Sequence, residues 1–165
     1  MLYKYRPLWI LFLFLLFGCS NDSGPSPSPV ETPQASDGTP VKLPGGPLWN
    51  IESVGSIGSA WEKKSFQVSS HGKFTISGWA VDQEAKMPAG GVDIVIDGTS
   101  HSAQYGGARP DVAAVKGSPT YANSGYTLDL AGEDFTAGSH SMLIRVLSND
   151  RKGFWEVGPY TLEFK

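Results

Sequence analysis

Side chains able to do acid, base or nucleophile chemistry are scattered along this chain of 165 residues, and few of them have a spacing that would bring them together. Asp93 and Asp97 are four positions apart and, on a strand, lie on one face. A glycoside hydrolase also places two carboxylates side by side, but it holds them on either side of a substrate in a cleft. Here both follow the solvent side of an alternating strand, and Asp97 belongs to a turn, so we expect no catalysis from them.

The histidines offer no alternative chemistry. His71, His101 and His140 stand 30 and 39 positions apart, without the close pair that would build a metal site on one strand or helix. The chain has neither a Gly-x-Ser-x-Gly elbow nor a glycine-rich phosphate loop. We therefore expect no enzyme activity and no metal.

Arg109 and Asp111 are the most notable charged residues, because they bracket Pro110 where a short helix is expected. In a structural role, Asp111 caps the helix and Arg109 bonds nearby carbonyls or a carboxylate. In the alternative role, both contact a ligand or partner. The residue types favour the structural role.

Three tryptophans are candidate contact residues. Trp79 alternates out of phase with Phe74 and Ile76, so it either packs beneath a loop, the commoner outcome, or faces solvent. An exposed indole can stack on a sugar ring, and Trp61 and Trp155 are further candidates for such a platform.

The elements that must position these residues are strands, because apolar residues recur with a period of two and without a helical stripe. The alternating runs lie at residues 74–80, 92–96 and 126–130, followed by runs at 141–148 and 160–164. Asp97-Gly98 predicts a two-residue hairpin, and Asn149-Asp150 with Gly153 predicts the next.

This spacing predicts an all-β domain over residues 48–165, an antiparallel sandwich of about seven strands, although barrel closure remains open. Seven strands in this length suit an immunoglobulin-like fold, without its usual cysteine pair. One segment departs from the strand pattern and predicts a helix over residues 110–116, with Pro110 at its first position.

The N-terminus has the features of an export signal. Lys4 and Arg6 precede an apolar stretch at residues 8–17, too short to cross a bilayer as a helix. The stretch ends in Leu16-Phe17-Gly18-Cys19, which resembles the lipobox of bacterial lipoproteins. The resemblance implies that residues 1–18 are a signal peptide cut between Gly18 and Cys19. It further implies that Cys19 carries a diacylglycerol on its thiol and an N-acyl chain, which together hold the protein on a membrane.

Two alternatives to this interpretation are a plain secretory signal with an incidental cysteine and a short uncleaved anchor. Cys19 is the only cysteine of the chain, so no intramolecular disulfide exists. Apart from the lipid we expect no cofactor.

Residues 19–47 read as a tether, because prolines and small polar residues dominate and no aromatic residue is present. Such a composition buries too little apolar surface to order itself, so we expect a disordered, semi-flexible spacer. A recognition motif or a glycosylated stalk is the alternative.

A second resemblance covers about half of the domain. The segments "SGWAVD" (77–82), "VDIVIDG" (92–98), "YGGARPDVA" (105–113) and "SGYTLDL" (124–130) occur in the order seen in immunoglobulin-like β-sandwich modules of bacterial secreted and cell-envelope proteins. The resemblance implies the same sandwich fold. It implies no single activity, because such modules accompany many different domains.

These features together predict a non-enzymatic envelope lipoprotein whose domain contacts an envelope protein or the cell wall. A carbohydrate-binding module is the main alternative, and a periplasmic enzyme is a weaker one. Without residues 1–18 the chain has 11 basic and 16 acidic side chains and a formal charge of −5, which excludes a basic nucleic-acid surface. Ser20 after the cysteine favours the outer membrane if the cell is Gram-negative, with the domain in the periplasm or at the cell surface.

Overall fold

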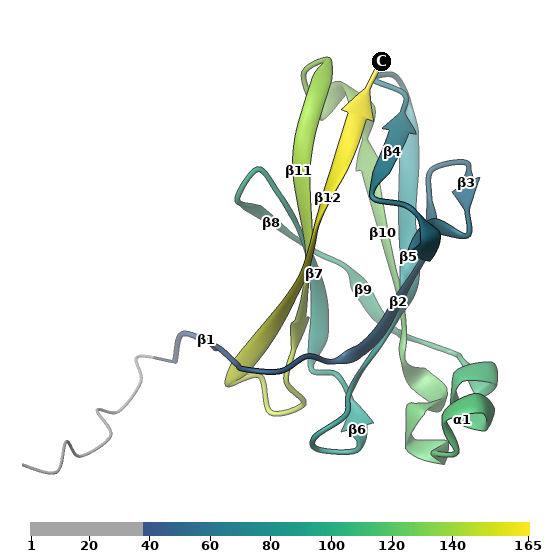
Figure 1. Ribbon diagram of the computed structural model, residues 1–165, viewed down its shortest axis with the longest axis vertical. Helices are drawn as coiled ribbons and strands as arrows, with labels where there is room; N and C mark the ends of the chain where they lie inside the picture. The colour runs from purple at the N-terminus through teal and green to yellow at the C-terminus, as the bar shows by residue number, and fades with distance from the viewer. Residues whose placement is uncertain (1–37) are drawn as a thin grey trace, which may run out of the picture. The chain divides into compact units, whose positions relative to one another are not determined.

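The computed structural model describes residues 38–165, which form two six-stranded sheets packed face to face (Figure 1). The strands are β1 (Val41–Lys42), β2 (Leu48–Val54), β3 (Ile57–Gly58), β4 (Ser65–Val68), β5 (Lys73–Asp82), β6 (Met87–Pro88), β7 (Gly91–Ile96), β8 (Thr99–Ser102), β9 (Gln104–Gly107), β10 (Gly125–Ala131), β11 (Gly138–Leu147) and β12 (Gly153–Phe164). The helical segments are α1 (Pro110–Lys116) and the 3-10 turns η1 (Ala60–Glu62), η2 (Pro119–Asn123) and η3 (Gly132–Asp134). Within residues 38–165 no helix is long and apolar enough to cross a bilayer.

The first sheet, sheet A, has the order β1-β12-β11-β7-β8, and β4 pairs with the far end of β12. The second, sheet B, has the order β3-β2-β5-β10-β9, and β6 pairs with β5. The all-β, two-sheet prediction is thus confirmed. The expected strand number and purely antiparallel pairing are wrong in detail, because β1 and β4 both run parallel to β12.

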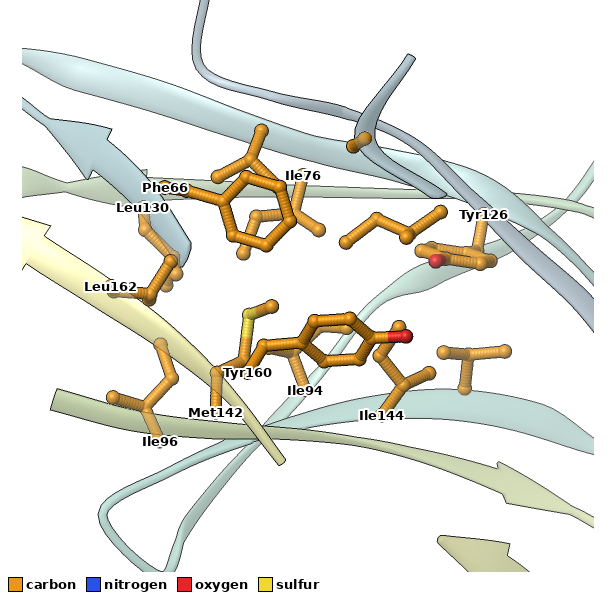
Figure 2. Packing of buried hydrophobic residues seen from close by; sticks show 14 of the residues in the cluster. Phe66, Ile76, Ile94, Ile96, Tyr126, Leu130, Met142, Ile144, Tyr160 and Leu162 are labelled. Carbon is orange, nitrogen blue, oxygen red and sulfur yellow. The ribbon is translucent and has the colours of Figure 1, made fainter. Parts of the chain in front are cut away.

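The core lies between the sheets and is built from the alternating positions of both. Figure 2 shows these side chains meeting from the two sides, among them Phe66, Ile76, Tyr126, Ile144 and Tyr160. All five are at most 3 % exposed. Burying one face of each strand is what fixes its register, because a slip of one residue would turn that face to water.

The turn and helix predictions are confirmed. Asp97 and Gly98 have φ of 47° and 83°, and Ile96 pairs directly with Thr99, as a two-residue hairpin requires. α1 begins at Pro110 and is followed by Gly117 in the left-handed conformation, a common way to end a helix.

The folded chain begins before Leu48, the expected start of the domain. Val41 and Lys42 pair with β12, and the Leu43 amide donates to the carbonyl of Phe154 at 2.8 Å. Strands this short have no alternation to read, so only tertiary pairing reveals them. Val41 and Lys42, expected within the tether at residues 19–47, are therefore a strand of sheet A, and Leu43 extends its hydrogen bonds to β12.

A second, smaller apolar cluster covers the outer face of sheet B. Trp79 and Val81 of β5 pack there against Val112 of α1 and Tyr121 of η2. β5 is consequently buried on both faces at its C-terminal end. This arrangement places α1 and the residues around it, including Arg109, directly over sheet B.

Candidate functional site

Three of the predicted contact residues, Trp79, Arg109 and Asp111, belong to the β5 and α1 region on the outside of sheet B. Trp61 lies in η1, and Trp155 lies in β12 of the other sheet. The structure therefore gathers the first three into one candidate site and separates the other two from it.

Arg109 is the centre of this site. Its Nη1 and Nη2 donate to the two carboxylate oxygens of Glu52 at 2.9 and 2.8 Å. Its Nε and Nη2 also donate to the two oxygens of Asp111 at 2.9 and 2.6 Å. The guanidinium has five N–H groups, and these two bidentate pairs occupy four of them. Little donor capacity is left for a ligand.

The pKa shifts of Asp111 and Arg109 agree with these hydrogen bonds. The Arg109 hydrogen bonds hold the pKa of the Asp111 carboxyl at about 2, and the charge of the guanidinium acts in the same direction. The hydrogen bonds that Arg109 donates to Asp111 and Glu52 raise the pKa of Arg109, although partial burial opposes them. The trio carries one net negative charge and ties α1 to β2 across sheet B.

Asp111 differs in part from its expected role. It sits in the first turn of α1, where a carboxylate is favourable, but its two oxygens bind the guanidinium of Arg109. Arg109 is itself the N-cap residue, and its side chain makes no capping bond. The structural role of Arg109 toward a carboxylate is observed, with Glu52 as the partner that sequence reasoning missed.

Trp79 packs beneath α1 and is 9 % exposed. The ammonium of Lys116, in the last turn of α1, lies 5.5 Å from the centroid of its ring. The neighbouring Gly78 is required for a different reason, since a Cβ there would lie 2.6 Å from the Tyr126 hydroxyl oxygen. That hydroxyl donates to the carbonyl of Asn50 across the sheet. The Gly-Trp pair therefore serves packing on both faces of β5.

The other tryptophans do not form a platform. Trp155 is 2 % exposed, and its Nε1 donates to the Pro44 carbonyl at 3.1 Å. Trp61 is 52 % exposed and is the only exposed aromatic side chain among residues 38–165. A sugar would thus find a single indole in this part of the chain, without a coplanar neighbour.

The carboxylates considered for catalysis are engaged within the fold. Asp93 accepts from the Ser102 hydroxyl at 2.7 Å. Asp97 accepts from the Ser141 amide at 2.8 Å, and its other oxygen lies 2.6 Å from Nδ1 of His140. Each stabilises the β7–β8 hairpin or its attachment to β11.

Two of the distant histidines, His101 and His140, lie against the same ring, that of Phe135. The rings of His101 and His140 lie 6.2 and 5.9 Å from that of Phe135, and all three line an open groove of about 300 Å³. Within residues 38–165 no three His, Cys, Asp or Glu side chains are grouped so as to hold a metal ion. The aromatic contacts point to packing of the hairpin tip.

A further groove of about 410 Å³ opens where β1 meets the β11–β12 turn, with Leu43 and Trp155 among its apolar lining. Its buried carboxylate, Asp82, accepts from the amides of Ala85 and Asn149, both at 2.9 Å. Asp82 thereby joins two loops. Its position at the end of "SGWAVD" did not predict this role.

Comparison with known proteins adds no relative. No protein-family model matches the chain, and no curated protein shows significant similarity to it.

Proposed function

We propose that this protein is a cell-envelope lipoprotein that displays a non-catalytic, immunoglobulin-like interaction domain from a membrane. The lipobox-like Leu16-Phe17-Gly18-Cys19 supports acylation of Cys19, and these residues lie outside the described part of the chain. Several acyl chains hold a protein on a bilayer where one alone binds marginally. The outer membrane is the proposed address in a Gram-negative cell.

The observation that carries the display role is the junction at residues 41–44. The Val41 and Leu43 amides donate to the carbonyls of Lys152 and Phe154. Leu43 also fills the space above Gly153, where a Cβ would come within 2.6 Å of its side chain. The chain that leads from Cys19 thus enters the domain through a strand fastened to β12.

The strand order supports the immunoglobulin-like part of the proposal. Taken along the chain, β2, β5, β7, β8, β9, β10, β11 and β12 take the places of strands A, B, C, C′, D, E, F and G. With this correspondence, sheet B has the order A-B-E-D and sheet A the order G-F-C with one added strand, C′, which agrees with the core strand order of that fold.

The non-catalytic part rests on how the candidate groups are used. Arg109 donates four of its five N–H groups to two carboxylates, and Asp93 and Asp97 bond within one hairpin region. A carbohydrate-binding role has one observation in its favour, the exposed Trp61. Quenching or a shift of tryptophan fluorescence by an oligosaccharide, lost in Trp61→Ala, would favour that role over a protein partner.

The lipoprotein assignment is tested by Cys19→Ser, with Ser20→Ala as the matched neighbour that keeps the thiol. We expect the natural chain and Ser20→Ala to incorporate labelled palmitate and to sediment with membranes. Cys19→Ser should incorporate none, because no other residue of the chain has a thiol. Equal labelling of Cys19→Ser would refute the assignment.

A further inference from the structure

β8 is a bare edge of sheet A. It pairs with β7 alone, with Thr99 opposite Ile96 and His101 opposite Ile94. The Ala103 amide continues this ladder to the Val92 carbonyl at 2.9 Å. Because bonding alternates along an antiparallel pair, the backbone N–H and C=O groups of Ser100 and Ser102 point away from the sheet. Figure 1 shows the β7–β8 hairpin extending from the body of the sandwich.

Apart from being only four residues long, this edge lacks the usual devices that prevent pairing with another chain. Natural edge strands are protected by charged side chains, prolines, bulges or a covering segment. From Thr99 to Ala108 the chain has no Lys, Arg, Asp, Glu or Pro, and β8 pairs with β7 without a register shift. The opposite side of sheet A is different, because β1 and β4 cover the ends of β12.

We propose that β8 is an interaction surface for a second copy of this chain, joined by antiparallel β8–β8 pairing about a twofold axis. The proposal deepens the proposed function and rests on it, because it names the partner of the displayed domain. With His101 opposite His101 of the second copy, Ser100 faces Ser102 in both directions. Both outward N–H and both outward C=O groups of each β8 are then paired, and sheet A continues into its copy.

Twofold symmetry and anchoring in one membrane favour a second copy over an unrelated partner, whereas net charge opposes it. Without residues 1–18 the chain has a formal charge of −5, so two copies repel over most of their surface. β8 offers an approach without a charged side chain, and its exposed residues Thr99, Ser100 and Ser102 are small. A twofold contact is also self-complementary, since each strand supplies what the other needs. Anchoring copies in one membrane would raise the local concentration that a short interface needs.

The pairing is tested by cross-linking full-length protein in membranes. His101 would lie on the axis in a non-hydrogen-bonded pair, where Cα atoms are about 4.5 Å apart, within the range of a disulfide. We expect His101→Cys to give a disulfide-linked dimer on mild oxidation. Thr127→Cys, exposed on β10 inside sheet B, is the control that should stay monomeric. A His101→Cys chain that stays monomeric, or links to a different protein, overturns the proposal.

A second change tests the hydrogen bonds themselves. Adding Ser100→Pro to His101→Cys removes an outward N–H from each copy and leaves the bonds to β7 in place. We expect the dimer fraction to fall about tenfold, because two interchain hydrogen bonds are lost. Ser65→Pro in the opposite edge strand β4 is the matched control that should keep the dimer. Undiminished dimer with Ser100→Pro contradicts the inference.

Two further measurements distinguish a failure of β8 pairing from misfolding of the proline variant and from a failure of the lipoprotein proposal. Ser100→Glu replaces Ser100→Pro if the proline variant does not fold, and it should reduce the dimer by placing like charges near the axis. Labelling of wild-type protein with a thiol reagent reports on Cys19 independently. An unlabelled, membrane-bound chain without dimer overturns β8 pairing alone, whereas a labelled, soluble chain overturns the lipoprotein proposal.

Discussion

The aliphatic stem of Arg109 lies directly over Gly125, so that a Cβ at position 125 would come within 3.2 Å of Arg109 Cγ and 3.0 Å of the Gly107 carbonyl oxygen. Gly125 opens β10 in sheet B and pairs with Trp79 of β5 on one side and Gly107 of β9 on the other. The missing side chain is therefore what lets the guanidinium extend across the sheet to Glu52.

Gly125→Val should displace Arg109 and weaken the link between α1 and β2. Overpacking of this kind costs about 1–3 kcal/mol, measured as the free energy of unfolding in denaturant. The pKa of Asp111 should at the same time rise from about 2 toward its ordinary value, because its cation has moved. Carbon-detected NMR titration reports that change.

Gly46→Val is the matched control, because a Cβ there meets no atom within 4 Å and the backbone has no positive φ. It should change the unfolding free energy by less than about 0.5 kcal/mol. Equal effects of the two substitutions would contradict the proposed contact of Gly125 with Arg109.

The alternating strands were predictable because each buries one face against the other sheet. β7 and β10 follow that rule, and their ranges match the runs at 92–96 and 126–130 closely. β2 was missed because its pattern is blurred, with a register shift between Ile51 and Ser53 and partial burial on both faces. β4 is four residues long and depends on β12 for its place.

Two charged residues of the candidate site could be predicted from the sequence, but the long-range contacts that they make could not. Arg109 and Asp111 stand out from their neighbours in the chain, and their pairing spans two positions. Glu52 lies 57 positions from Arg109, within strand β2, which no alternation of apolar residues marked. Similarly, His140 and Asp97 are 43 positions apart in the sequence, and they come into contact only because β11 lies beside β7. Long-range pairs of this kind are set by sheet order, which local patterns do not encode.

The cluster beneath α1 should depend on Val112 and not on its neighbour in the same helix. Val112 is 4 % exposed among Trp79, Val81 and Tyr121, whereas Val115 is 80 % exposed. Val112→Ala should lower the unfolding free energy by roughly 1–3 kcal/mol through lost burial and the cavity left behind. Val115→Ala should be within about 0.5 kcal/mol of the natural chain. Similar losses for both would mean that α1 is not packed on sheet B as described.

The attachment of the hairpin tip should depend on pH. His140 lies between two acceptors, with Nε2 2.9 Å from the Thr136 carbonyl oxygen and Nδ1 2.6 Å from Asp97 Oδ2. A carbonyl and a carboxylate both accept, so the doubly protonated ring satisfies the two contacts. The hydrogen bond to the Thr136 carbonyl raises the pKa of His140 most, and the hydrogen bond to Asp97 raises it further. The negative charge of Glu163 acts in the same direction. Asp134 and His101 line the same groove.

A raised folded-state pKa makes the His140 contribution complete below the unfolded value of about 6.5 and removes it as pH rises through the folded value. The pKa of Asp97 is lowered, chiefly by His140 and then by the Ser141 amide. Its contribution is complete above about pH 4 and is lost as pH falls through the folded value. The pair therefore stabilises the fold most between these limits.

His140→Gln should accordingly destabilise the domain most near pH 5 to 6 and progressively less as the pH rises above the raised pKa. Denaturant unfolding of both chains across that range measures the difference, and proton NMR of the His140 ring gives the folded pKa directly. His71→Gln is the control for loss of an imidazole, because His71 lies exposed in the β4–β5 turn and its substitution should change the unfolding free energy by less than about 0.5 kcal/mol. A stability difference for His140→Gln that stays constant from pH 5 to 9 would show that the ring is held by packing against Phe135 and Phe164 and not by its charge.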